Sequence, residues 1–499
     1  MVDRRHAEEF LSRLPQDDPF RMLEEITFWL KALRDAYGVL PERVFEVVDL
    51  FDQSANAHQR RLTSEFVALG SRYRKFQAQR IWNTSFQYAR ELGATYQYLV
   101  TQYRTGVVGW DVLQPELPVI VARAIRALRL ELKWSLLRHG PVDQLLWQLA
   151  GKLFAYAEEN KFAADNVKIY RGEQKLSSPQ REYLQALMLG ISATDGLVPD
   201  HAHLVDCFIQ QYAEFFALER APRPGCHYYA NLGSAKAPAR LVERIAPAST
   251  LRYFGPDKAA SVVDRMIETI NDRGMVPPEL NPDGMHEPGA ILHVLDHLAL
   301  YWGPSPPIRT SERTGALTRI SVVHDFDAIL SMVSGESQEL DFNSNVEIWS
   351  VENESQGGFG AVITETVSDW IEIGSLLGIR MEEGAAWGIG LVRRLHSPAA
   401  GVTHVGIVSL SRGVMKVNLS RPAAGNSCTD LNALLLLSSD EGSAHKAEVT
   451  VMLPSGTFAM DQSFTMRAIE RTYILLPRKL LESGEGYELT RYFVRRAET

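Results

Sequence analysis

The sequence has few cysteines and no long apolar run, and both absences narrow the class of protein. Cys207, Cys226 and Cys428 are an odd number of widely spaced thiols with no CxxC pair, so no disulfide framework is expected and a reducing compartment is the simplest environment. The apolar stretch 433–437 is far shorter than the ~20 residues that span a bilayer. Residues 1–9 are charged and lack the apolar region of a signal peptide. We therefore expect a soluble, cytoplasmic protein without a transmembrane segment.

The sequence also lacks the common signatures of nucleotide-using enzymes. It contains no GxxxxGK[ST] loop and no strand–GxGxxG–helix unit. Ser409 and Ser411 have no GxSxG context. We therefore predict that the chain is not an enzyme and carries no metal and no cofactor.

Length and charge limit the domain count and the partners. A chain of 499 residues predicts about three domains. Its net charge of −9 does not favour unspecific binding to nucleic acid or to an anionic membrane. The oligomeric state is not indicated by the sequence.

The secondary structure predicted from the sequence changes twice along the chain, which indicates a multidomain α+β fold. Residues 1–220 have helical periodicity; for example, Asp18 and Pro19 provide an N-cap and a first helical residue. Residues 221–304 form a mixed α/β connecting region, which ends in a stiff Pro-rich linker at 304–307. The remainder is β-rich: 305–415 predict one β-domain, and 416–499 predict either a second small β-domain or an extension of the first.

Two short motifs at the start of the β-rich part carry the strongest functional signal. Arg309 and Arg313 form an RxxxR, and Asn353, Ser355 and Gly358 form an NxSxxG. A guanidinium group suits phosphate oxygens and guanine edges, and it stacks on planar bases. Small polar side chains on a tight glycine turn can hydrogen-bond a base at close range. The two motifs together predict a site for a small, multiply charged nucleotide.

These motifs, followed by a strand that begins Trp387-Gly-Ile-Gly-Leu-Val-Arg-Arg and a Val-Gly-Ile strand at 405–407, resemble a PilZ domain over residues 305–415. PilZ domains are small bacterial antiparallel β-barrels that bind cyclic di-GMP. The resemblance implies that Arg309 and Arg313 grip phosphates and guanine faces, that Asn353 and Ser355 contact a guanine, and that Gly358 allows the turn. No GGDEF-like or EAL-like stretch is present, so neither synthesis nor hydrolysis of the dinucleotide is supported.

The resemblance leads to a functional hypothesis with one main alternative. We expect a bacterial cyclic di-GMP receptor whose barrel binds the dinucleotide and signals through the helical module to an unknown protein partner. The alternative is a PilZ-shaped protein-interaction adaptor that binds no nucleotide. Ile308, where the family frequently has arginine, and the long gap from Arg313 to Asn353 favour the adaptor. The intact motif residues favour the receptor.

For three other patterns we prefer an ordinary structural explanation to a functional one. His293 and His297 stand four apart, as in some metal sites, which gives a metal-dependent hydrolase as a third alternative. Aromatic and basic residues are interleaved over 72–104, a mixture that can bind nucleic acid. On a helix, however, we expect the aromatic side chains to pack inward and the Lys and Arg side chains to face water. The basic helix predicted at 118–138 is expected to bury an apolar stripe and to expose a solvated basic face.

Overall fold

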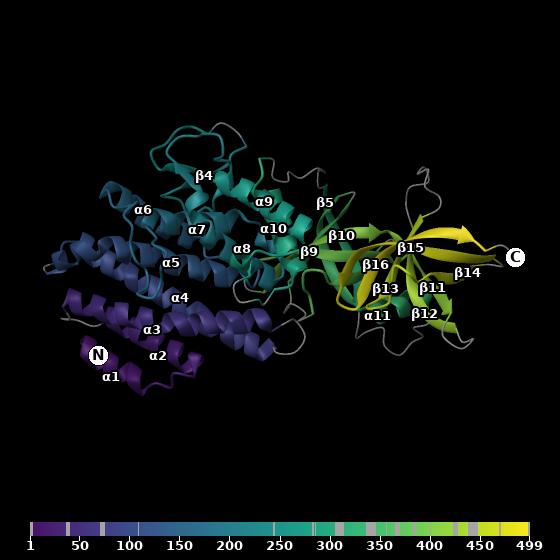
Figure 1. The fold of residues 1–499 in the computed structure, drawn as a ribbon, viewed down its shortest axis with the longest axis horizontal. Coiled ribbons are helices and arrows are strands. Elements are labelled where there is room, and N and C mark those ends of the chain that lie inside the picture. The colour runs from purple at the N-terminus through teal and green to yellow at the C-terminus, as the bar shows by residue number, and fades with distance from the viewer. Residues whose placement is uncertain are drawn as a thin grey trace. The chain divides into compact units, whose positions relative to one another are not determined.

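The computed structural model divides the chain into two compact units, residues 1–308 and 309–499 (Figure 1). The structure describes residues 3–35, 40–69, 75–107, 109–242, 245–281, 284, 286–304, 314–335, 346–355, 357–364, 370–382, 386–399, 401–422, 428–437, 448–468 and 471–497.

The first unit is mainly helical, as residues 1–220 predict. Its described helices before the first strand are α1 (Arg4–Arg13), α2 (Pro19–Asp35), α3 (Pro41–Ala68), α4 (Lys75–Arg104), η1 (Trp110–Glu116), α5 (Leu117–Leu136), α6 (Leu145–Glu159), α7 (Pro179–Ile191), η2 (Thr194–Gly196), α8 (Pro199–Gln211) and η3 (Ala213–Phe215). The Asp18 carboxylate accepts a hydrogen bond from the Arg21 backbone N–H at 3.1 Å, just before Pro19 opens α2. The predicted N-cap is therefore confirmed.

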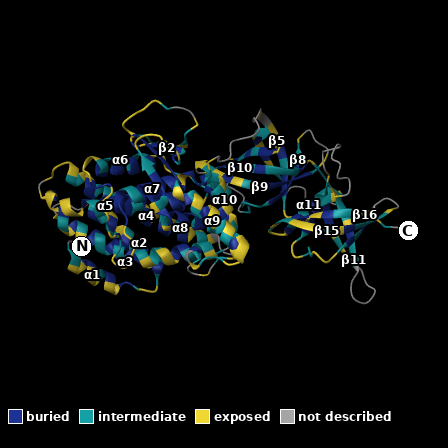
Figure 2. Cartoon of the chain, turned by 45° about the horizontal axis from the view of Figure 1, so that its top comes forward, coloured by how far each residue is buried: buried dark blue, intermediate teal, exposed yellow. Residues whose placement is uncertain are grey.

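Helix α5 lies at the centre of this unit and is buried on most of its circumference (Figure 2). The expectation of a solvated basic face on this helix is wrong, because Arg123, Arg129 and Lys133 are all buried. Carboxylates on the neighbouring helices α3 and α8 pair with these cations and allow their burial. On α4 Tyr88 and Tyr96 pack inward as expected, whereas Phe76 at the start of the helix is exposed.

The end of the first unit adds a small antiparallel sheet and two more long helices. The sheet has the order β1–β4–β2–β3, and the following helices are α9 and α10. Their bounds are β1 (Ala217–Glu219), β2 (Tyr228–Asn231), β3 (Ala239–Arg240), β4 (Leu251–Gly255), α9 (Lys258–Arg273), η4 (Pro278–Leu280) and α10 (Pro288–Trp302). Gly274 caps α9 with a φ of 64°, a left-handed conformation that glycine adopts without strain.

The second unit begins with a closed six-stranded antiparallel barrel in the order β10–β7–β6–β5–β8–β9. Its elements are β5 (Thr314–His324), α11 (Phe326–Ser334), β6 (Glu347–Ser355), β7 (Gly358–Ile363), β8 (Leu376–Met381), β9 (Gly388–Ala399) and β10 (Val402–Ser411). Alternate residues of each strand fill the interior. They include Ile320, Trp349, Val351, Ala361 and Val405.

The C-terminal residues close into a second six-stranded antiparallel barrel rather than extending the first. Its order is β11–β12–β13–β16–β15–β14. The strands are β11 (Gly413–Pro422), β12 (Cys428–Leu437), β13 (Glu448–Pro454), β14 (Phe464–Ala468), β15 (Arg471–Gly484) and β16 (Tyr487–Arg496). The predicted multidomain α+β class is therefore confirmed.

Several interactions join the two barrels within the second unit. The Arg393 guanidinium of β9 pairs with both carboxylate oxygens of Glu482 on β15. The Tyr487 hydroxyl of β16 donates a hydrogen bond of 3.1 Å to the Gly374 carbonyl in the first barrel. Helix α11 also packs its buried face among residues of both barrels.

Within the described parts of the chain, no helix has the length and apolar character needed to cross a membrane.

Candidate functional site

Three of the five motif residues lie together at the corner where β6 meets β7 in the first barrel. Asn353 and Ser355 end β6, and Gly358 begins β7. Ser355 and Gly358 are opposite each other in the strand register. Arg309 and Arg313 lie outside the described residues. The structure therefore places the polar-glycine motif but not the arginine pair.

A β-bulge turns Asn353 to the outer face of the barrel. The register of β6 against β7 shifts between Val351 and Asn353, so Val351 pairs with Ala361 whereas Asn353 pairs with Gly360. Val351 and Ala361 are in the core, so strand alternation turns residue 360 outward. Without the extra residue, Asn353 would point inward as Val351 does.

The Asn353 side chain lies directly over Gly360. A Cβ atom at position 360 would stand only 2.4 Å from Asn353 Oδ1 and 2.8 Å from its Nδ2. The Oδ1 atom is buried and has no hydrogen-bond partner among the described residues. A buried, unpaired amide oxygen is costly, and such a group is satisfied when a ligand donates to it. This amide is therefore the clearest recognition group at the corner.

Ser355 and Gly358 have local structural roles of their own. The Ser355 hydroxyl donates a hydrogen bond of 3.2 Å to the Gly358 carbonyl, and its oxygen keeps acceptor capacity. A Cβ atom at residue 358 would lie 2.0 Å from the Ile407 carbonyl oxygen on β10. Close approach of β7 to β10 therefore requires glycine at this position, which is a different reason from the turn conformation expected from the motif.

A pair of glycines lies next to this corner on the outer face. Gly360 on β7 pairs with Gly406 on β10, which in turn pairs with Arg394 on β9. Side chains of the neighbouring strands lie over both glycines: a Cβ atom at 360 would meet the Asn353 amide, and one at 406 would lie 3.1 Å from the Arg394 Cβ atom. Sequence reasoning missed the role of Gly360, although the alternation of glycine at 358 and 360 was a visible signal.

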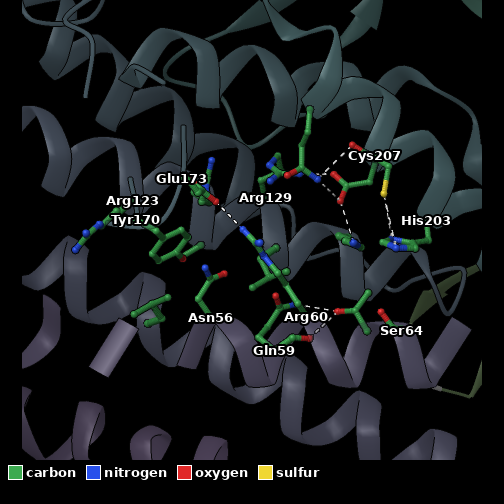
Figure 3. Close-up of a pocket in the computed structure, with 18 residues that line it drawn as sticks. Asn56, Gln59, Arg60, Ser64, Arg123, Arg129, Tyr170, Glu173, His203 and Cys207 are labelled. Carbon is green, nitrogen blue, oxygen red and sulfur yellow. Dashed lines mark hydrogen bonds and ion pairs between the residues drawn. The ribbon is translucent and has the colours of Figure 1, made fainter. Parts of the chain in front are cut away.

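The helical unit contains a separate polar cavity of about 280 Å³ (Figure 3). The cavity is lined by α3, α4, α5, α8 and the segment before α7. Its charged lining residues are Arg60, Arg123, Arg126, Arg129, Lys133, Glu173 and Asp206. Sequence reasoning missed this site because it placed the basic residues of α5 in solvent.

One wall of the cavity is fixed by a buried carboxylate. Asp52 on α3 accepts hydrogen bonds from the hydroxyls of Tyr88 at 3.3 Å, Tyr96 at 2.7 Å and Tyr170 at 2.9 Å. Burial and the Asp52 carboxylate raise the pKa of all three tyrosines, so they remain neutral donors. The network holds Tyr170, which lines the cavity, against α3 and α4.

The two histidines of the hydrolase alternative have separate neighbours. His297 Nε2 lies 2.8 Å from the Ser192 carbonyl oxygen, and the His293 ring lies 5.1 Å from the ring of His201. No group of three or more His, Cys, Asp or Glu side chains suited to hold a metal ion occurs in the part of the chain that the structure describes.

Comparison with known proteins gives one informative match. Residues 5–223 match the family model described as "Cyclic-di-GMP receptor FimW, N-terminal domain". The match covers less than half of the chain; it includes every residue that lines the polar cavity and ends before the barrels. No curated protein and no solved structure matches the chain.

Proposed function

We propose that the protein is a cyclic di-GMP receptor of the PilZ type that binds the dinucleotide on the first barrel, at the β6–β7 corner, and that it is not an enzyme. The observation that carries the proposal is the Asn353 amide, which the bulge turns outward and whose buried oxygen has no partner among the described residues. The match of residues 5–223 to a domain of a cyclic di-GMP receptor supports the same ligand independently, because it lies outside the barrel.

The chemistry of the corner suits a guanine base. The Watson–Crick edge of guanine donates through N1 and N2, and an amide oxygen accepts such hydrogen bonds. The absence of a side chain at Gly360 lets the Asn353 amide lie over β7, which fixes the position of this group. Arg309 and Arg313, which precede β5 in the chain, would supply charge for the phosphates. In this proposal Asn353 and Ser355 read the base, and the arginines bind phosphate and stack on the base.

Titration calorimetry of the full chain with cyclic di-GMP tests the proposal. We expect a dissociation constant between nanomolar and low micromolar, which corresponds to about −8 to −12 kcal/mol. Cyclic di-AMP is the control for base recognition, because adenine lacks the two donors that face Asn353. Absence of heat with ~100 µM cyclic di-GMP would refute the receptor and favour a PilZ-shaped adaptor that binds protein alone.

Two matched variants separate recognition from folding. Asn353→Ala removes the amide at the corner, whereas Asn418→Ala removes an exposed amide from β11 of the second barrel. We expect Asn353→Ala alone to weaken binding. Equal affinities of the two variants would show that the corner does not contact the ligand.

We further propose that the barrel signals to the helical unit through the Pro-rich linker at 304–307. A Pro-rich segment is stiffer than a Gly/Ser coil, so ordering of Arg309 on a ligand would constrain the chain that leads from α10. Hydrogen exchange should then change on ligand addition in the C-terminal turn of α10 as well as in the barrel. A change confined to the barrel would contradict signalling by this route.

A further inference from the structure

The basic side chains of α5 gather on one side of the helix and line the polar cavity. Arg123, Arg126, Arg129 and Lys133 follow one another at intervals of three, three and four residues, which places them on one helix face. Arg60 of α3 lines the same cavity (Figure 3). Buried cations are costly unless each is paired, so the partner of each group decides what the cavity can hold.

Three of these cations each contact at least one carboxylate other than Asp206. Arg123 Nη1 lies 2.7 Å from Asp49, and its other nitrogens donate to the Ile169 carbonyl. Arg126 grips both carboxylate oxygens of Glu182, at 3.1 and 3.0 Å. Arg60 pairs with Glu173 at 2.6 Å.

The other two cations share one carboxylate. Arg129 Nη1 and Lys133 Nζ both contact Asp206 of α8, the latter at 2.9 Å. Gln210 Nε2 donates to the same carboxylate at 3.0 Å, so it has little capacity left. Arg129 is 5% exposed, Lys133 6% and Asp206 1%. At hydrogen-bond distance, two buried cations therefore share one carboxylate in this part of the cavity.

Arg129 also has a hydrogen-bond donor without a partner. Its Nε is buried and meets no acceptor among the described residues. His203, which lines the cavity beside Asp206, does not add to the charge, because burial and the nearby Lys133 ammonium lower the pKa of His203 to about 3. Two cations on one carboxylate and an unsatisfied N–H at the same place both favour an acceptor that carries negative charge.

We propose that this cavity is a second ligand site, which binds the phosphoryl group of a small metabolite at Arg129 and Lys133. The phosphate oxygens accept from Arg129 Nε and provide a second anionic partner for the two cations that share Asp206. With about 280 Å³, the cavity is slightly smaller than the ~300–1,000 Å³ of typical small-molecule pockets, which suits a small ligand such as a sugar phosphate or a mononucleotide. Half-buried polar residues of α3, Asn56 and Ser64, line the remaining space for the rest of such a ligand.

Calorimetric titration of the full chain with inorganic phosphate tests this site, at an ionic strength held constant with chloride. Arg60→Glu puts a carboxylate in the lining at a position whose native side chain is 62% exposed, so folding is little affected. Arg61→Glu is the matched control, because Arg61 makes the same charge change on the next residue of α3 and does not line the cavity. Arg129→Gln removes the central cation itself.

We expect the native chain to bind phosphate, Arg60→Glu to bind it about tenfold more weakly or worse, and Arg61→Glu to bind it within about twofold of native. GMP should compete with phosphate. Arg129→Gln should abolish binding. If circular dichroism shows that this variant unfolds, the comparison of Arg60→Glu with Arg61→Glu tests the proposal in its place. Equal phosphate affinities of Arg60→Glu and Arg61→Glu would show an adventitious ion only. Absence of heat with the native chain would show that the cavity holds water and no phosphate. Either result overturns the proposal. Cyclic di-GMP affinity should be unchanged in Arg60→Glu, so this test fails or succeeds independently of the barrel site.

Discussion

Gly360→Ala is expected to remove cyclic di-GMP binding without harming the barrel. The added methyl carbon would lie 2.4, 2.8 and 2.9 Å from three atoms of the Asn353 amide, which is closer than carbon atoms approach such groups. The amide, as the flexible end of a side chain, has to swing away from its place over β7. The substitution therefore displaces the recognition group while Asn353 itself remains in the chain.

The size of the effect follows from what the displaced amide would lose. One neutral hydrogen bond contributes ~0.5–1.5 kcal/mol net, so two such bonds to guanine amount to ~1–3 kcal/mol, or about 5- to 150-fold in affinity. Stability should change little, because alanine is favoured over glycine within strands by ~0.5–1 kcal/mol, which offsets the cost of moving Asn353. The variant should therefore fold normally and bind weakly.

Calorimetry with cyclic di-GMP and thermal unfolding measure the two effects separately. Gly413→Ala on β11 is the matched control, because its Cβ atom would make only an ordinary contact, 3.4 Å from the Leu437 side chain. Native affinity in Gly360→Ala would refute the assignment of Asn353 as a ligand contact. An equal loss in Gly413→Ala would show that the barrel is merely sensitive to strand glycines.

Three further predictions concern other parts of the chain. Arg313→Ala should weaken cyclic di-GMP binding more than Ser355→Ala, since a charged hydrogen bond contributes ~1.5–3 kcal/mol and a neutral one ~0.5–1.5; calorimetry that gives the reverse order would show that the bond from Ser355 to the Gly358 carbonyl shapes the site. Asp52→Ala should destabilise the helical unit by ~3–5 kcal/mol, because it leaves three buried tyrosine hydroxyls without their acceptor; an unchanged unfolding midpoint would contradict this. Burial raises the pKa of Glu131 from 4.5 to about 7, so the folded form keeps a proton that the unfolded chain releases, and stability falls as the pH rises from 4.5 to 7. Glu131→Gln should therefore stabilise the protein at pH 8 by up to ~3 kcal/mol and have no effect near pH 4, which thermal unfolding at the two pH values checks.

Local signals in the sequence were sufficient for element ends and for the change of fold class along the chain. Asp18 and Pro19 open α2, and Gly274 closes α9, because capping and left-handed conformations depend on one or two residues. The alternation of apolar residues after residue 313 predicted the β-rich half for the same reason.

The features that give the chain its two candidate sites were decided by contacts between distant residues. Arg129 and Lys133 are charged residues that the sequence predicts to be in water, and they are buried because Asp206, more than seventy residues later, lies beside them. Asn353 faces outward because a bulge in β6 sets its register against Gly360. A periodic pattern gives the face of an isolated helix or strand, but register and charge pairing belong to the partner element, so only the tertiary structure could determine them.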